Sequence, residues 1–162
     1  MEKMLNDLYR QIAETVNEMI PERWGKFYFY AQISDDGGGT YFYYQPETDL
    51  RSYEYSLEIP LKFQVNEREF KLSKKKLLSL SEKMRGVFKD EEQEPWYSFT
   101  LSLERSGKLN VHFDYTNWFE TNYSFSDQFI IWKYKYLNEI PQDSALQELI
   151  NRYSEEFPDN PI

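Results

Sequence analysis

The chain has 162 residues, no cysteine and a formal net charge of -9. A chain of this length can stabilise one core unaided, and the lack of thiols excludes a disulfide framework, a cysteine nucleophile and a sulfur-ligated zinc site. Aromatic residues make up 19% of the chain, so much of the core must be aromatic. The negative charge disfavours direct binding to nucleic acid or anionic lipid and favours cationic partners.

The first predicted element is an amphipathic helix that ends near Pro21. Its apolar residues recur at spacings of three and four, as expected for one helical face. The N-terminal stretch MEKMLNDLYRQIAE carries charges throughout and lacks the apolar core of a signal peptide. We therefore expect a cytoplasmic protein that does not associate with membranes. The apolar face of the helix consists of Leu5, Leu8, Ile12, Val16 and Met19.

Three strands are predicted next. KFYFYAQIS (residues 26–34) and TYFYYQ (40–45) are rich in β-formers, and the DDGGG between them predicts a Gly-rich turn. In YEYSLEIP (53–60), Tyr and Leu alternate with Glu and Ser, which predicts a third strand. A short extended piece is expected in LKFQVN (61–66).

The second half predicts a helix, a hairpin and two more helices. The helix spans 73–92, and the hairpin joins WYSFTLSLE (96–104) to KLNVHFDY (108–115). Residues 126–141 fit both the alternation of a strand and the spacing of a helix. Ser126 and Asp127 are suitable N-caps and favour a helix. Ser144 and Gln147 have capping-box spacing for the last helix, and the tail is expected to fray from about 157. The element order predicts one α+β domain over 1–162, with a largely antiparallel sheet packed against helices.

Catalytic motifs are weak. The glycines of SDDGGG follow two carboxylates and precede a β-rich run, a context that suits neither a phosphate loop nor a calcium loop. His112 and Asp114 share one face of a predicted strand but lack a nucleophile. We expect no catalytic residues, no cofactor and no metal. The alternative is a metal-dependent nuclease-like enzyme built on Asp49, Glu69 and Lys71.

Aromatic and acidic residues occur together at three places, a composition that suits anchors for a basic protein partner. Core packing is the competing explanation for every aromatic residue among them. The candidate binding residues are Asp35, Asp36, Tyr41 and Tyr43 at the first hairpin, Glu91, Glu92 and Trp96 after the second helix, and Asp114, Tyr115 and Trp118 after the second hairpin.

Three blocks resemble the YezG-like immunity proteins. MIPERWGKFYFYAQISDDGGGTYFYY is similar to the family's N-terminal signature, EPWYSFTLSLERSGKLNVHFDYTNW to its second signature and YKYLNEIPQD to its closing segment. The blocks occur in family order and span almost the whole chain. Asn138 and Glu139 stand where the family pattern leads us to expect a glycine-containing turn.

The resemblance implies an antitoxin that binds and neutralises the C-terminal domain, commonly a nuclease, of a cognate secreted toxin. Such a protein acts by tight stoichiometric binding and has no catalytic residues, so the ten candidate residues become hypothetical toxin contacts. The antitoxin could inhibit by covering the active site of the toxin or by holding the toxin in an inactive shape, and both remain alternatives. Whether the toxin cleaves DNA or RNA is also open. A general protein-interaction module is a further alternative, and the sequence predicts no oligomeric state.

Overall fold

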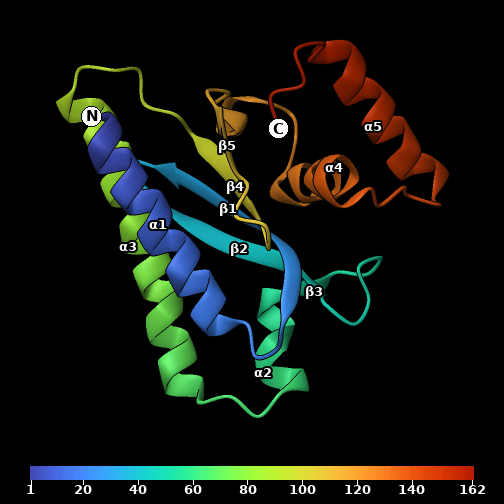
Figure 1. Ribbon diagram of the computed structural model, residues 1–162. Coiled ribbons are helices and arrows are strands. Elements are labelled where there is room, and N and C mark those ends of the chain that lie inside the picture. The colour runs from blue at the N-terminus through green and yellow to red at the C-terminus, as the bar shows by residue number, and fades with distance from the viewer. The chain divides into compact units, whose positions relative to one another are not determined.

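The computed structural model describes all 162 residues. It contains two compact units, Met1–Phe113 and Asp114–Ile162 (Figure 1). The boundary falls within strand β5 (Leu109–Asp114), so no linker separates the units. That residues 1–162 fold as one domain stays a prediction.

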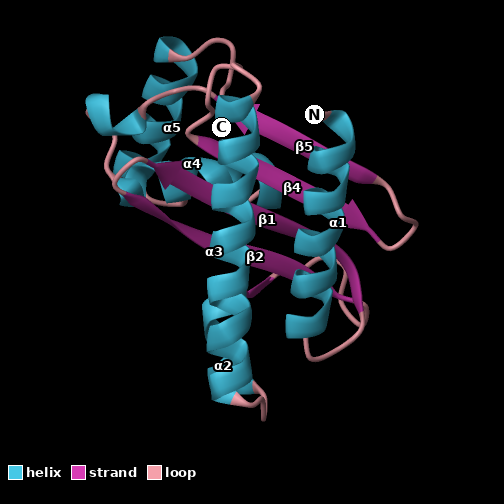
Figure 2. Ribbon diagram, turned by 90° about the vertical axis from the view of Figure 1, so that its left-hand side faces the viewer, coloured by secondary structure: helices cyan, strands magenta, loops and turns pink.

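The first unit contains a five-stranded sheet in the order β3-β2-β1-β4-β5. Strand β1 pairs antiparallel with both β2 and β4, and β2 pairs antiparallel with β3. Helices α1 and α3 lie across one face of this sheet (Figure 2). These features confirm the α+β class. The elements are α1 (Glu2–Met19), β1 (Trp24–Ser34), β2 (Gly37–Pro46), β3 (Glu54–Tyr55), a 3-10 turn (Ser56–Glu58), α2 (Ile59–Lys62), α3 (Glu67–Asp90), β4 (Ser98–Glu104) and β5.

The core lies between the sheet and the two helices, and aromatic rings form much of it, as the composition predicts. Phe27 of β1 pairs with Tyr44 of β2, and Phe29 pairs with Phe42. All four side chains are buried in one cluster with the apolar face of α1. Alternation along the strands directs these rings to one face of the sheet.

The third strand is much shorter than predicted. Only Glu54–Tyr55 forms a strand, and the chain then turns through a 3-10 helix into α2. Pro60 cannot donate to a strand ladder but fits the first turn of a helix, where the N–H has no partner in any case. The Phe42 N–H donates to the Ser56 hydroxyl at 3.1 Å, so a side chain takes the place of the backbone carbonyl that a longer strand would offer. The extended piece predicted from residue 61 is wrong at its start for the same reason.

Helix α3 begins at Glu67, six residues before the predicted start at residue 73. The Asn66 side chain accepts the Glu69 N–H at 3.0 Å and caps the helix. Phe70 is the first buried residue of this helix. The early start therefore depends on one cap and one apolar anchor rather than on a full apolar stripe.

The second unit contains a 3-10 turn (Trp118–Glu120) and helices α4 (Phe125–Leu137) and α5 (Ser144–Glu156). Ser124 and Asp127 form the capping box of α4, so the predicted N-caps, Ser126 and Asp127, are wrong. Asp143 rather than Ser144 caps α5. Both corrections move the cap toward the N-terminus, to the residue whose side chain reaches the free N–H groups. Asn138 ends α4 in the left-handed region, with φ of 56°.

The C-terminal tail makes hydrogen bonds and buries its last residue in this structure, and that it frays from about residue 157 stays a prediction. Ile162 is 3% exposed, and its N–H donates to the Tyr153 hydroxyl at 3.0 Å. That hydroxyl in turn donates to the Asn160 side chain at 2.9 Å, and the Lys135 amine donates to the Asn160 carbonyl at 3.1 Å. Polar contacts and one buried apolar residue therefore join the tail to α4 and α5.

Candidate functional site

The tip of the β1–β2 hairpin consists of Asp35 and Asp36. Ser34 pairs with Gly37, so these two aspartates form the turn, and the glycines predicted to form it lie in β2 instead. Gly37 adopts φ of 124°, which L side chains rarely tolerate. A Cβ at residue 38 would overlap the Gln32 carbonyl oxygen, so glycine there permits close approach of the two strands. The turn thus presents two neighbouring carboxylates to solvent.

The hairpin tip is held against the C-terminal end of α3. The Asp35 carboxylate accepts from the Arg85 guanidinium at 2.9 Å and from the Lys89 amine at 2.8 Å. The Arg85 side chain is only 7% exposed, and its Nε donates to the Trp96 carbonyl at 2.9 Å. The Ile33 N–H donates to the carbonyl of residue 97 at 2.9 Å. Both ends of the α3–β4 loop are therefore fixed beside the tip.

This arrangement gathers acids from two distant segments, and we call the result the acidic edge. All six carboxylates are exposed, and only that of Asp35 forms an ion pair. Unpaired exposed carboxylates that lie close together attract a cationic partner and raise its association rate. The acidic edge consists of Asp35 and Asp36 at the hairpin tip and Asp90, Glu91, Glu92 and Glu94 at the end of α3 and in the loop that follows.

Four of the candidate binding residues in the first unit therefore belong to the acidic edge, and three do not. Trp96 is fully buried and packs edge-on against Phe99, with ring centroids 5.0 Å apart. Tyr41 and Tyr43 are each 7% exposed. A partner can reach none of these three rings in this structure, so they serve packing here.

In the second unit, Asp114 and Trp118 contact each other. The Trp118 indole N–H donates to the Asp114 carboxylate at 2.7 Å, and both residues are buried. Trp118 also packs edge-on against the ring of Tyr123 and at a tilt against that of Phe157. Tyr115 is 44% exposed. Sequence alone could not separate these roles, because an aromatic–acidic pair has the same composition in a core and at an interface.

The Asp35 ion pairs make stability depend on pH. Hydrogen bonds from Lys89 and Arg85 lower the Asp35 pKa below its ordinary value of 3.8. The ion pairs stabilise the fold when the pH is above the ordinary pKa. This contribution is lost as the pH falls through the lowered pKa. Asp35→Asn should therefore reduce the urea midpoint at pH 7, and its effect should vanish once the pH is below the lowered pKa of Asp35. Asp36→Asn is the control, because its carboxylate forms no ion pair; equal effects of both variants would contradict the assignment.

The residues of the predicted enzyme alternative do not assemble into a metal site. Asp49 lies in the loop after β2, where its carboxylate accepts the Arg51 N–H, whereas Glu69 and Lys71 lie in the first turns of α3. No three His, Cys, Asp or Glu side chains lie close enough together to hold a metal ion. None of the helices has the length and apolar character needed to span a membrane.

Comparison with known proteins gives related sequences over nearly the full length. The chain is 31% identical over 150 residues to Immunity protein YezG of Bacillus subtilis (strain 168), covering 92% of this chain and 98% of the relative. It is 32% identical over 142 residues to Type VII secretion system protein EsaG of Staphylococcus aureus (strain NCTC 8325 / PS 47), covering 87% and 86%. Residues 5–151 match the family described as Immunity protein YezG-like. The chain therefore belongs to the YezG-like immunity protein family.

Proposed function

We propose that this protein is a cytoplasmic antitoxin that binds the C-terminal nuclease domain of a cognate secreted toxin and neutralises it stoichiometrically. The acidic edge carries this proposal. Its five unpaired carboxylates are exposed and held at one end of the first unit by the Asp35 ion pairs. Membership of an immunity protein family supports the functional class, and the acidic edge is the proposed binding surface.

The charge of the edge suits a nuclease. An enzyme that binds nucleic acid presents Lys and Arg to the phosphate backbone, and these cations complement clustered carboxylates. The net charge of -9 also attracts a cationic partner at long range. Covering the basic active-site groove of the toxin is the simplest way in which such an edge would inhibit. The name of the staphylococcal relative, a type VII secretion system protein, agrees with a partner that is secreted.

Among the candidate toxin contacts, Asp36, Glu91, Glu92 and Tyr115 contact the toxin directly, since these side chains are exposed. Asp35 has a supporting role, because its carboxylate is occupied by Arg85 and Lys89. The test is to add this protein in increasing amounts to the C-terminal domain of the toxin encoded beside it. Cleavage of DNA and RNA by the toxin domain is followed, and it should stop at about an equimolar ratio.

A further inference from the structure

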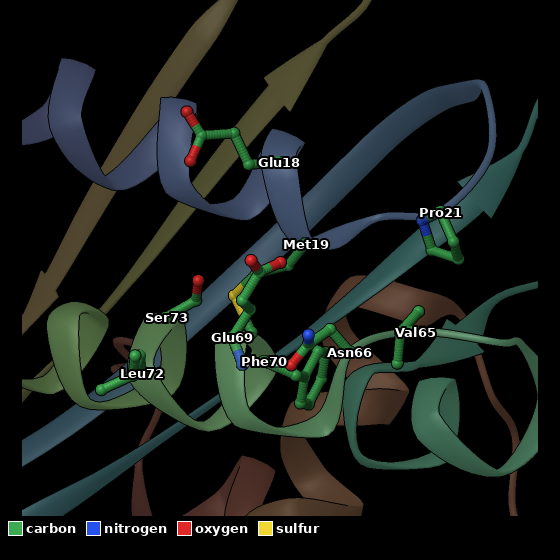
Figure 3. A pocket seen from close by; sticks show the side chains of 9 residues that line it. All are labelled: Glu18, Met19, Pro21, Val65, Asn66, Glu69, Phe70, Leu72 and Ser73. Atoms are coloured by element: carbon green, nitrogen blue, oxygen red, sulfur yellow. Dashed lines mark hydrogen bonds between the residues drawn. The ribbon is translucent and has the colours of Figure 1, made fainter.

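A surface groove of about 510 Å³ lies between the C-terminal end of α1 and the N-terminal end of α3, at the other end of α3 from the acidic edge. We call it the α1–α3 groove. Figure 3 shows its lining side chains: Glu18, Met19 and Pro21 from α1 and the turn after it, and Val65, Asn66, Glu69, Phe70, Leu72 and Ser73 from α3 and the residues before it.

The floor of the groove is apolar. Met19 and Phe70 are 6% and 7% exposed, so they form a fixed base that belongs to the core. Leu72 at the rim is 55% exposed. An apolar side chain laid in the groove would cover carbon surface on both sides, and this burial is favourable.

The charged groups that line the groove are all negative. The carboxylates of Glu18 and Glu69 form no ion pair or hydrogen bond, and no lysine or arginine lines the groove. Four other surface hollows each include at least one lysine or arginine. The α1–α3 groove therefore differs in combining an apolar floor with carboxylates that no cation neutralises.

An anionic ligand does not suit this groove, although the N-terminus of a long helix borders it. Asn66 already accepts the Glu69 N–H at 3.0 Å, and Glu67 and Glu69 occupy the first turn of α3. These carboxylates complement the helix dipole and would repel phosphate. The complementary ligand is an apolar group with neighbouring positive charges.

We propose that the α1–α3 groove binds a segment of the toxin in which an apolar side chain covers Met19 and Phe70 and adjacent Lys or Arg residues pair with Glu18 and Glu69. The source of the segment rests on the proposed function. Glu69 and Lys89 lie on the same helix, about 30 Å apart at 1.5 Å per residue. A domain of about 100 residues is wide enough to contact both the groove and the acidic edge.

The first test uses a peptide and does not depend on the toxin. The ¹⁵N-labelled protein is titrated with acetyl-GKRLFKRG-amide and followed by NMR. We expect saturable shifts of the Met19, Phe70 and Ser73 amides. At these three amides, two control peptides should bind at least tenfold more weakly: one with Gly-Gly in place of Leu-Phe, the other with Glu in place of every Lys and Arg. Equal binding of either control, or shifts confined to other residues, would overturn the groove assignment.

The second test identifies the source of the segment. Glu18→Lys/Glu69→Lys should weaken binding of the toxin domain about tenfold, whereas Glu148→Lys/Glu155→Lys on α5, with the same change of charge, should not. Glu18→Gln/Glu69→Gln gives a smaller loss and serves if the reversed variant melts early. Unchanged toxin affinity beside lost peptide binding would overturn the toxin as the source. Failure of the wild-type protein to bind the toxin would overturn the proposed function, while the peptide titration still decides what the groove binds.

Discussion

Reversing three charges of the acidic edge is expected to slow association with the toxin domain by about tenfold or more at low ionic strength. The variant is Asp36→Lys/Glu91→Lys/Glu92→Lys, which leaves the Asp35 ion pairs intact. Because exposed charges act mainly on diffusional encounter, the dissociation rate should change less than the association rate. Stopped-flow mixing at low and high salt measures both effects.

The control carries the same change of net charge at exposed sites that do not belong to the edge: Glu2→Lys/Glu148→Lys/Glu155→Lys. This variant should lose only the long-range part of the attraction, so its association rate should stay nearer that of the wild type. If the two variants associate at the same rate, the edge is not the contact surface and only net charge steers the encounter.

Trp96→Ala is expected to lower the free energy of unfolding by about 3–5 kcal/mol, the usual cost of removing a large buried ring. Trp96 is fully buried and contacts the rings of Phe99 and Phe113. The expectation separates two roles, since a contact residue would affect toxin binding and leave stability almost unchanged. Urea unfolding followed by circular dichroism measures the loss.

Trp96→Phe is the matched variant. The indole N–H is buried without a hydrogen-bond partner, so replacing it by a carbon ring removes an unsatisfied donor. This gain offsets part of the cost of the cavity, which is smaller than in Trp96→Ala. We expect the free energy of unfolding to fall by only about 1–2 kcal/mol. A stable Trp96→Ala protein with weakened toxin binding would show instead that the ring is reached by the partner.

Periodicity was a good guide to the long elements and a poor one to short or capped segments. The apolar face of α1 and the β-rich runs of β1 and β2 predicted their structures because each buries one regular face. The strand predicted over 53–60 failed because a proline and one buried serine hydroxyl decided the local backbone. Such single contacts produce no repeating pattern in the sequence.

The acidic edge was only partly predictable. The sequence indicated acids at the hairpin tip and after α3, but not that Lys89 would join them through Asp35, 54 residues away in the chain. The burial of Trp96 and Trp118 was equally hidden, because composition does not reveal which side of a strand or turn faces the core. The α1–α3 groove had no sequence signal, since its two walls come from helices far apart in the chain.

The central claim is neutralisation by stoichiometric binding, and one titration tests it most directly. Increasing amounts of this protein are added to a fixed amount of the C-terminal toxin domain, and cleavage of DNA and RNA is followed. Inhibition should rise linearly and become complete at about one molecule of protein per toxin domain, as expected when binding is tight. Full cleavage in the presence of a several-fold excess of this protein would contradict the account, as would cleavage by this protein alone with magnesium.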